Sequence, residues 1–175
     1  MRKITLICGT NRENSYSEKV AKHYESELRA MGVEVCFLNL KQFSGIIGLD
    51  EIYNKTKSEA FNSFVSKNIS NADSFVIIVP EYNGSFPGVV KVFLDAVHPS
   101  HWAGKKVCLT GVSSGRAGNL RGMEHLTGVL LYLKLLIFHN RLPISMIDKI
   151  MVDDNSLPEE TKSAIQNQLE GFLKF

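Results

Sequence analysis

Short apolar runs alternate along the chain with segments whose apolar residues recur at helical spacing. The runs are nearly continuous in apolar residues, as strands buried on both faces of a sheet are. This pattern predicts five parallel strands joined by helices. The predicted strands are Lys3 to Cys8, Val33 to Asn39, Ser74 to Pro80, Lys106 to Val112 and Leu136 to Leu142.

The segments between these runs have the periodicity of amphipathic helices. Gly32 is placed to end the first helix, and Pro87 suits the first turn of the third. Thr56 and Glu59 form a candidate capping box for the second, and the last helix is expected to begin near Ser156. The expected buried faces are Val20, Tyr24, Leu28 and Met31; Phe61, Phe64, Val65 and Ile69; Val90, Phe93, Leu94 and Val97; Met123, Leu126, Leu130 and Leu131; and Ile165, Leu169 and Phe172.

Alternation of strands and helices predicts an α/β fold, a flavodoxin-like three-layer α/β/α sandwich with a five-stranded parallel sheet in the order 2-1-3-4-5. In this order the loops after Cys8 and Val79 meet around one ligand at the switch point. The 175 residues are expected to form a single domain spanning 1–175. The segment from Gln42 to Lys55 is an expected irregular excursion, which would either cover the site or pack as a surface loop.

The residues that follow the first predicted strand, Gly9 to Ser17, place hydroxyls, amides and one guanidinium where a helix begins. Unpaired N–H groups and the helix dipole favour an anion there. The Arg12 guanidinium adds a positive charge that can donate two parallel hydrogen bonds to it. Ser15 and Glu18 also fit an ordinary capping box, so a phosphate cradle and a plain helix start both remain open. Ser15 could cap the helix or donate to phosphate, and its single proton would not fully serve both. The segment matches neither the Walker loop nor the dinucleotide fingerprint.

Two further loops follow the third and fourth strands. Pro80 to Gly88 is rich in turn residues, and Asn83 and Gly84 tolerate backbone angles that aim amides inward. This loop can supply an aromatic wall and polar edge for a flat heterocycle, or it is a plain strand-to-helix turn. Ser113 to Gly118 consists largely of small residues, which permit close approach of the backbone to a ligand.

The composition excludes several classes of protein. The charge of +2, from 20 basic and 18 acidic residues without a basic stripe, argues against nucleic acid as a partner. No apolar segment approaches the roughly 20 residues of a membrane span, and no secretory signal is expected at the start. Cys8, Cys36 and Cys108 lack metal-ligand spacing, which predicts reduced core thiols in a cytoplasmic protein. Pro99 separates His98 from His101, so a helical metal pair is not expected.

The loop motifs together resemble those of the NADPH-dependent FMN reductase family, which includes quinone, azo-dye and chromate reductases. The resemblance continues through Lys91, Leu94 and Asp95 and covers nearly the whole chain. The chain departs from the usual pattern at Ser17, where the family often has asparagine, and at Ala96, where it often has tryptophan. The motifs that carry the resemblance are Gly9-Thr10-x-Arg12-x-x-Ser15-x-Ser17, Pro80-Glu81-Tyr82-Asn83, Phe86-Pro87-Gly88 and Trp102-Ala103-Gly104-Lys105-Lys106.

The resemblance implies FMN as cofactor and NADPH or NADH as transient donor. By this resemblance, the FMN phosphate would be held by Thr10, Arg12, Ser15 and Ser17. The isoalloxazine ring would be lined by Pro80, Glu81, Tyr82 and Asn83. Tyr16, Gly84, Ser113, Ser114, Gly115 and Arg116 complete the expected cofactor-binding set. For Arg116, tuning of the flavin and simple solvation are both open. No catalytic side chain and no metal are expected, because the flavin carries the chemistry.

The leading hypothesis is an FMN-dependent oxidoreductase that takes hydride from NAD(P)H and reduces a small acceptor by a ping-pong route. The acceptor would be a flavin, quinone, azo compound or metal oxyanion. One alternative is a flavodoxin-type electron-transfer protein, although such carriers are commonly strongly acidic. Another is a structural domain without flavin, against which the intact first loop argues. The resemblance also implies a homodimer or tetramer, with Val92 to Trp102 a candidate contact segment.

Overall fold

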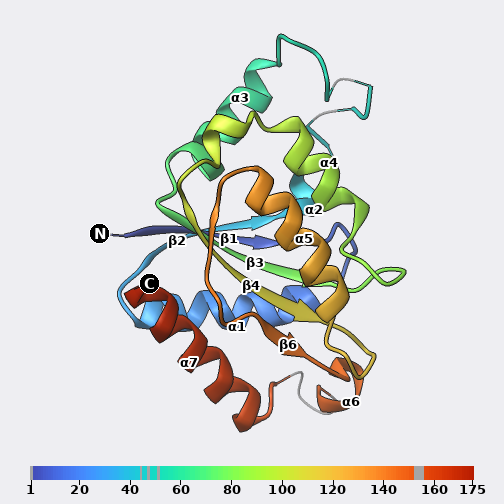
Figure 1. Cartoon of the computed structure of the whole chain (residues 1–175), viewed down its shortest axis with the longest axis vertical. Helices are drawn as coiled ribbons and strands as arrows, with labels where there is room; N and C mark the ends of the chain where they lie inside the picture. The colour runs from blue at the N-terminus through green and yellow to red at the C-terminus, as the bar shows by residue number, and fades with distance from the viewer. Residues whose placement is uncertain (1, 44, 47, 51, 152–155) are drawn as a thin grey trace.

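A single parallel sheet organises the molecule, with helices packed on both of its faces (Figure 1). The computed structural model describes residues 2–43, 45–46, 48–50, 52–151 and 156–175. The strands are β1 (Lys3–Cys8), β2 (Glu34–Asn39), β3 (Ser74–Pro80), β4 (Lys106–Val112), β5 (Leu136–Ile137) and β6 (Leu142–Ile144). The helices are α1 (Tyr16–Ala30), α2 (Leu40–Phe43), α3 (Glu59–Val65), α4 (Gly88–Ala96), α5 (Leu120–Tyr132), α6 (Ile147–Ile150) and α7 (Glu159–Lys174). Two short helical segments of other types, Ser66–Ser70 and Pro99–His101, precede β3 and β4.

The sheet has the predicted flavodoxin-like order, β2-β1-β3-β4-β5, and the strand pairs among its described residues are parallel. The sixth strand, β6, pairs with β4 beyond the point where β5 ends. The carboxyl ends of β1, β3 and β4 therefore lie next to one another, which brings the three loops of interest to one edge.

The prediction of one continuous fifth strand from Leu136 to Leu142 is wrong, because the chain leaves the sheet between β5 and β6. The buried Gln168 of α7 fills the gap. Its Nε2 donates to the carbonyl of Leu109 in β4 over 3.0 Å and to that of Asn140 over 2.8 Å. A side chain thus supplies the donor that a continuous strand would have offered to β4.

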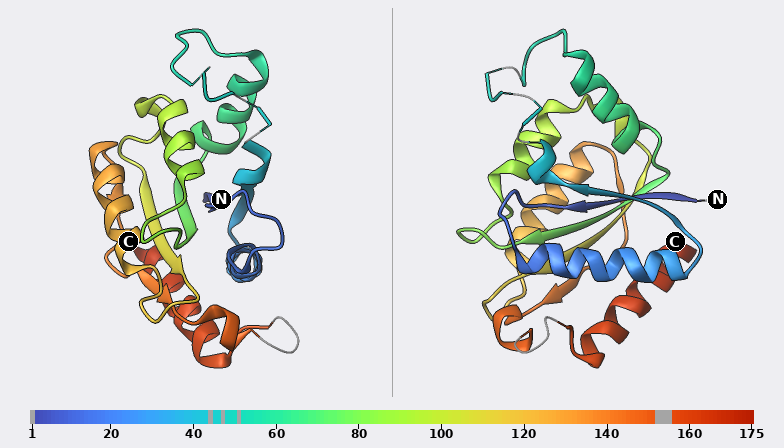
Figure 2. Two further views of the ribbon diagram at one scale, coloured as in Figure 1. Left: turned by 90° about the vertical axis from the view of Figure 1, so that its right-hand side faces the viewer. Right: turned by 180° about the vertical axis from the view of Figure 1, so that it is seen from behind.

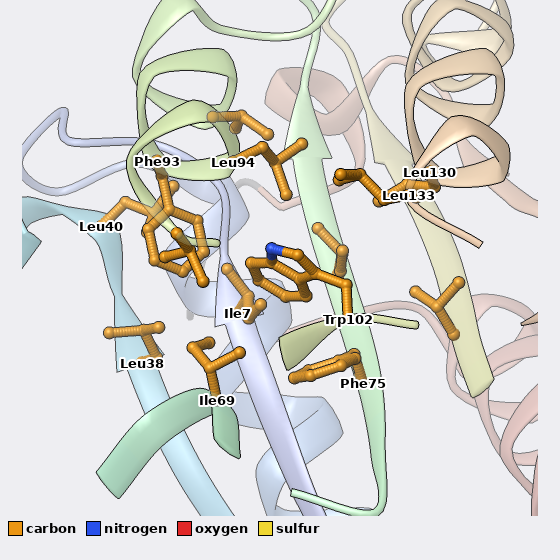
Figure 3. Close-up of a cluster of buried hydrophobic side chains, with 14 of the residues drawn as sticks. Ile7, Leu38, Leu40, Ile69, Phe75, Phe93, Leu94, Trp102, Leu130 and Leu133 are labelled. Atoms are coloured by element: carbon orange, nitrogen blue, oxygen red, sulfur yellow. The ribbon is translucent and has the colours of Figure 1, made fainter. Parts of the chain in front are cut away.

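The two faces of the sheet carry separate apolar clusters. Leu6 and Tyr24 belong to the cluster beneath α1 and α7, and Ile77 and Phe93 to the one beneath α3, α4 and α5. Figure 2 shows α1 and α5 on opposite sides of the sheet. In the second cluster, Trp102 is fully buried, with its ring centroid 5.1 Å from that of Phe75 and 5.6 Å from that of Phe93 (Figure 3). The Trp102 side chain is therefore buried by other residues of the same chain.

Two details of the helices and one of strand β2 differ from the sequence pattern. Leu131 is 58% exposed, so it does not belong to the buried face of α5. Ser58, and not Thr56, caps α3, because its Oγ accepts the N–H of Phe61 over 3.2 Å. Cys36 is half-buried, whereas Cys8 and Cys108 are core residues as predicted. The predicted C-terminal glycine of α1 is confirmed, since Gly32 has a φ of +77°.

The excursion after β2 packs against the cluster beneath α4. Ile52 is buried there, and Ile46 is packed against the same cluster, while Ile47 lies outside the described residues. No described helix is long and apolar enough to cross a membrane. Among the residues that the structure describes, no three His, Cys, Asp or Glu side chains are grouped as a metal site would require.

Candidate functional site

The first loop leaves the sheet through a close contact between β1 and β3. The N–H of Gly9 donates to the carbonyl of Ile78 over 2.8 Å. A Cβ on Gly9 would lie 2.7 Å from Cγ1 of Val79 and 3.0 Å from that carbonyl oxygen. Glycine is therefore needed here, and its lack of a side chain places the first loop directly beside the second.

Helix α1 begins in this loop with Ser15 as its N-cap. Ser15 Oγ accepts the N–H of Glu18 over 3.1 Å, which confirms the serine half of the predicted capping box. The expectation that Ser15 must choose between capping and phosphate is wrong, because the cap uses an oxygen lone pair and leaves the hydroxyl proton free to donate. The N–H groups of Tyr16 and Ser17, at the first two helical positions, have no acceptor within the helix. This end of α1 is consequently a set of donors.

The charges of the loop are arranged to suit an anion. Arg12 is exposed. Among the described residues, its guanidinium has no hydrogen-bond partner, and only its backbone N–H is bonded. Glu13, the one acidic residue in the loop, is paired with Lys41 at 2.6 Å. The hydrogen bond and charge of Lys41 hold the pKa of Glu13 below its usual value. The acid is therefore neutralised by a neighbour while the arginine remains available.

Thr10 is the most deeply buried serine or threonine of the loop, at 0% exposed against 2% for Ser17 and 8% for Ser15. Its Oγ1 accepts the N–H of Arg12 over 3.1 Å and lies 2.8 Å from the hydroxyl oxygen of Tyr82. A side chain of the first loop is thus joined to the second loop, 72 residues away in the sequence.

The second loop is a tight hairpin turn. Tyr82 and Ser85 exchange backbone hydrogen bonds of 2.9 and 3.1 Å, and the residues between them, Asn83 and Gly84, have φ values of +51° and +76°. Two successive positive φ values mark the type I′ turn for which Asn-Gly is favoured, as the sequence indicated. The buried Asn119 supports the entry to this loop, since its Nδ2 donates to the carbonyl of Val79 over 3.0 Å.

The third loop is tied to both of its neighbours. Ser113 Oγ donates to Oε2 of Glu81 over 3.0 Å and accepts the N–H of Gly115 over 2.9 Å. The backbone of Ser113 also receives the N–H of Ile147 at 3.1 Å and donates to the carbonyl of Ile144 at 3.0 Å. The loop after β4 is therefore held between the second loop and the turn that follows β6.

The three loops surround one hollow of about 460 Å³. Its residues are Arg12, Glu13, Asn14, Ser15, Tyr16, Ser17, Pro80, Glu81, Tyr82, Val112, Ser113, Ser114 and Ile147. The structure thus brings together most of the predicted site residues from segments far apart in sequence. Of the predicted set, Thr10, Asn83, Gly84, Gly115 and Arg116 are not in this lining.

Four lining residues were absent from the predicted set. Glu13 and Asn14 lie inside the predicted loop, and Val112 ends the predicted fourth strand. Ile147 reaches the hollow because β6 pairs alongside β4. The sequence does hold a signal for β6, the apolar run Leu142-Pro143-Ile144. The prediction missed it because Leu142 was assigned to the end of the fifth strand.

The lining fits the two chemically different ends of FMN. Arg12, Ser15 and the start of α1 provide the donors that a phosphate requires. Pro80, Tyr82 and Val112 provide a flat or apolar wall of the kind that a planar ring requires.

Comparison with known proteins places the chain in a family. The profile of the NADPH-dependent FMN reductase family matches residues 2–147. A 2-hydroxy-1,4-benzoquinone reductase from a Burkholderia species is 28% identical over 97% of this chain and 93% of its own length. The chain belongs to the NADPH-dependent FMN reductase family. It is accordingly an oxidoreductase with FMN as cofactor and NAD(P)H as donor.

Solved structures agree on the fold. The flavoenzyme FerB, an NAD(P)H:(acceptor) oxidoreductase from Paracoccus denitrificans, superposes with a TM-score of 0.82 at 21% identity, over 99% of this chain and 96% of its own. Oxidised flavodoxin 1 from Bacillus cereus superposes with a TM-score of 0.61 at 14% identity, over 98% and 97% of the two chains. The flavodoxin-like fold is confirmed.

Proposed function

We propose that the hollow at the carboxyl ends of β1, β3 and β4 binds FMN and that the protein passes electrons from NAD(P)H to a small acceptor. The observation that carries this proposal is the convergence of three loops on one hollow with donors at one end and a flat wall at the other. Arg12, Ser15, Tyr16 and Ser17 hold the phosphate.

The second and third loops hold the ring in this proposal. Pro80, Glu81 and Tyr82 form one wall, and Ser113 and Ser114 line the hollow beside it. The chemistry that FMN supplies when bound is two-electron exchange, so the chain needs no acid, base or nucleophile of its own. Its residues bind and orient the ring and set the charge around it.

We further propose a quinone-type acceptor and a ping-pong route. NAD(P)H gives up a hydride and leaves as NAD(P)⁺, and a quinone then takes two electrons and two protons, one of them from solvent, to become a hydroquinone. The 28% identity to a benzoquinone reductase over almost the whole chain supports this choice. The acceptor is consumed only after the oxidised nicotinamide has departed.

Initial rates test the route directly. With NADPH and 1,4-benzoquinone varied together, a ping-pong route gives parallel lines in double-reciprocal plots. Intersecting lines would show that donor and acceptor are bound at the same time. Replacing the quinone by an azo dye or chromate in the same assay ranks the acceptor classes.

The remaining expectations from the resemblance stay predictions. One is a homodimer or tetramer, and a cytoplasmic location, which the three thiols indicated, is likewise still a prediction. Since Trp102 is fully buried within one chain, any subunit contact from Val92 to Trp102 would have to use the other residues of that segment.

A further inference from the structure

We infer that Thr10 is a positioning residue that acts on the flavin site through the Tyr82 hydroxyl, and that it is not a ligand of the phosphate. The inference rests on the proposed function, because it concerns how Tyr82 is held against the hollow assigned to FMN. It reassigns one residue that the sequence motif places among the phosphate ligands.

Thr10 differs from its neighbours in the motif because it does not line the hollow. Thr10 is fully buried and is not in the lining of the hollow, whereas Arg12, Ser15 and Ser17 all line it. Ser15 and Ser17 are themselves buried, at 8% and 2% exposed, yet both still line the hollow. The side chain of Thr10 therefore faces the inside of the loop and not the cofactor position.

The hydrogen bonds of Thr10 account for its hydroxyl. One lone pair of Oγ1 accepts the N–H of Arg12 over 3.1 Å. The same oxygen lies 2.8 Å from the Tyr82 hydroxyl, and either oxygen can be the donor of that bond. If Thr10 donates, its only proton is spent on Tyr82. If Tyr82 donates, the proton of Thr10 remains, but on a buried oxygen that does not face the hollow.

The bond has a specific consequence for the ring wall. The backbone of Tyr82 is held by the two hydrogen bonds that it exchanges with Ser85 across the turn. Thr10 fixes the far end of the side chain from the opposite loop. The orientation of the tyrosine ring toward the hollow is thereby set by a residue of the phosphate loop.

The test compares the ring environment with the affinity. Thr10→Val keeps the shape of the side chain and removes the hydroxyl, Thr10→Ser keeps the hydroxyl, and Tyr82→Phe removes the partner oxygen. Each protein is saturated with FMN, and the visible circular dichroism of the bound flavin is recorded beside the Kd for FMN. Tyr132→Phe, an 84% exposed tyrosine on α5, is the matched control.

We expect Thr10→Val and Tyr82→Phe to change the flavin spectrum in the same way and to raise the Kd by about threefold to tenfold. The double variant should match Thr10→Val, because Tyr82 has then already lost its partner. Thr10→Ser and Tyr132→Phe should match the wild type.

A different pattern overturns the inference. A Thr10→Val protein that binds FMN more weakly but shows the wild-type spectrum at saturation would make Thr10 a phosphate ligand. Additive effects of Thr10→Val and Tyr82→Phe would show that the two act separately. If Thr10→Val does not fold, an unchanged flavin spectrum in Tyr82→Phe alone is sufficient to reject the inference. Failure of the wild-type protein to bind FMN would contradict the proposed function itself.

Discussion

Ser113 Oγ donates a hydrogen bond to Oε2 of Glu81 over 3.0 Å, which joins the loop after β4 to the loop after β3. The same oxygen accepts the N–H of Gly115 over 2.9 Å, so one hydroxyl orders both loops. Both Ser113 and Glu81 line the hollow assigned to FMN.

Ser113→Ala should weaken FMN binding because it removes this link and leaves the Gly115 N–H without its acceptor. A hydrogen bond to a carboxylate contributes about 1.5 to 3 kcal/mol, which corresponds to an increase in Kd of at most about tenfold to a hundredfold. Glu81→Gln is the control, since its amide oxygen still accepts from Ser113. Fluorescence titration of apoprotein with FMN measures the Kd of both variants, and wild-type affinity in Ser113→Ala would show that this link does not support FMN binding.

Arg12→Ala should have the largest effect on FMN affinity of any single substitution in the first loop. A charged hydrogen bond contributes about 1.5 to 3 kcal/mol, so the Kd should rise by about tenfold to a hundredfold. Lys22→Ala removes a cation from the exposed side of α1, the helix that follows this loop, and should leave the Kd unchanged. The same fluorescence titration with FMN measures the Kd of both variants. Wild-type affinity in Arg12→Ala would show that the phosphate binds away from Arg12.

The sequence predicted the parts of the fold that depend on local pattern. Strands β3 and β4 have the predicted bounds, because their apolar runs end at a proline or enter a loop of small residues. The 2-1-3-4-5 order followed from the alternation of strands and helices. Since this order fixes which loops adjoin, much of the hollow could be predicted as well.

What could not be predicted depends on contacts between distant segments. The interruption between β5 and β6 depends on Gln168, which comes from the last helix. The Thr10 hydroxyl bonds to Tyr82 from a loop 72 residues away, and a motif specifies a hydroxyl but not the direction in which it points. Ile147 enters the hollow only through the pairing of β6 with β4.

Gln168→Leu should destabilise the protein by removing the donor that closes the gap in the sheet. Gln168 is fully buried, and its loss leaves the carbonyls of Leu109 and Asn140 without this partner. Unpaired buried groups cost about 1 to 3 kcal/mol each, so we expect a loss of about 2 to 4 kcal/mol. Urea denaturation measures this loss in the free energy of unfolding. Gln166→Leu, on the exposed side of the same helix, should change stability by less than about 0.5 kcal/mol.

The thiols should differ in reactivity. Burial, with the charge of Glu18 in second place, raises the pKa of Cys8 to about 12, and burial raises the pKa of Cys108 still further. Only the thiolate is reactive, so both should be inert at pH 7.5 in the native protein. Half-buried Cys36 should be the one thiol that reacts with a disulfide reagent, and Cys36→Ser should abolish that reaction. Rapid native labelling of Cys8 would contradict its burial.

The central claim is that FMN bound in the hollow between the three loops is reduced by a nicotinamide. The most direct measurement is the absorption spectrum of the protein after incubation with FMN and removal of the excess, followed by anaerobic titration with NADPH and with NADH. We predict one FMN retained per chain and complete bleaching in a single two-electron step by one equivalent of donor. A protein that retains no flavin, or retains flavin that neither nucleotide reduces, would contradict the account.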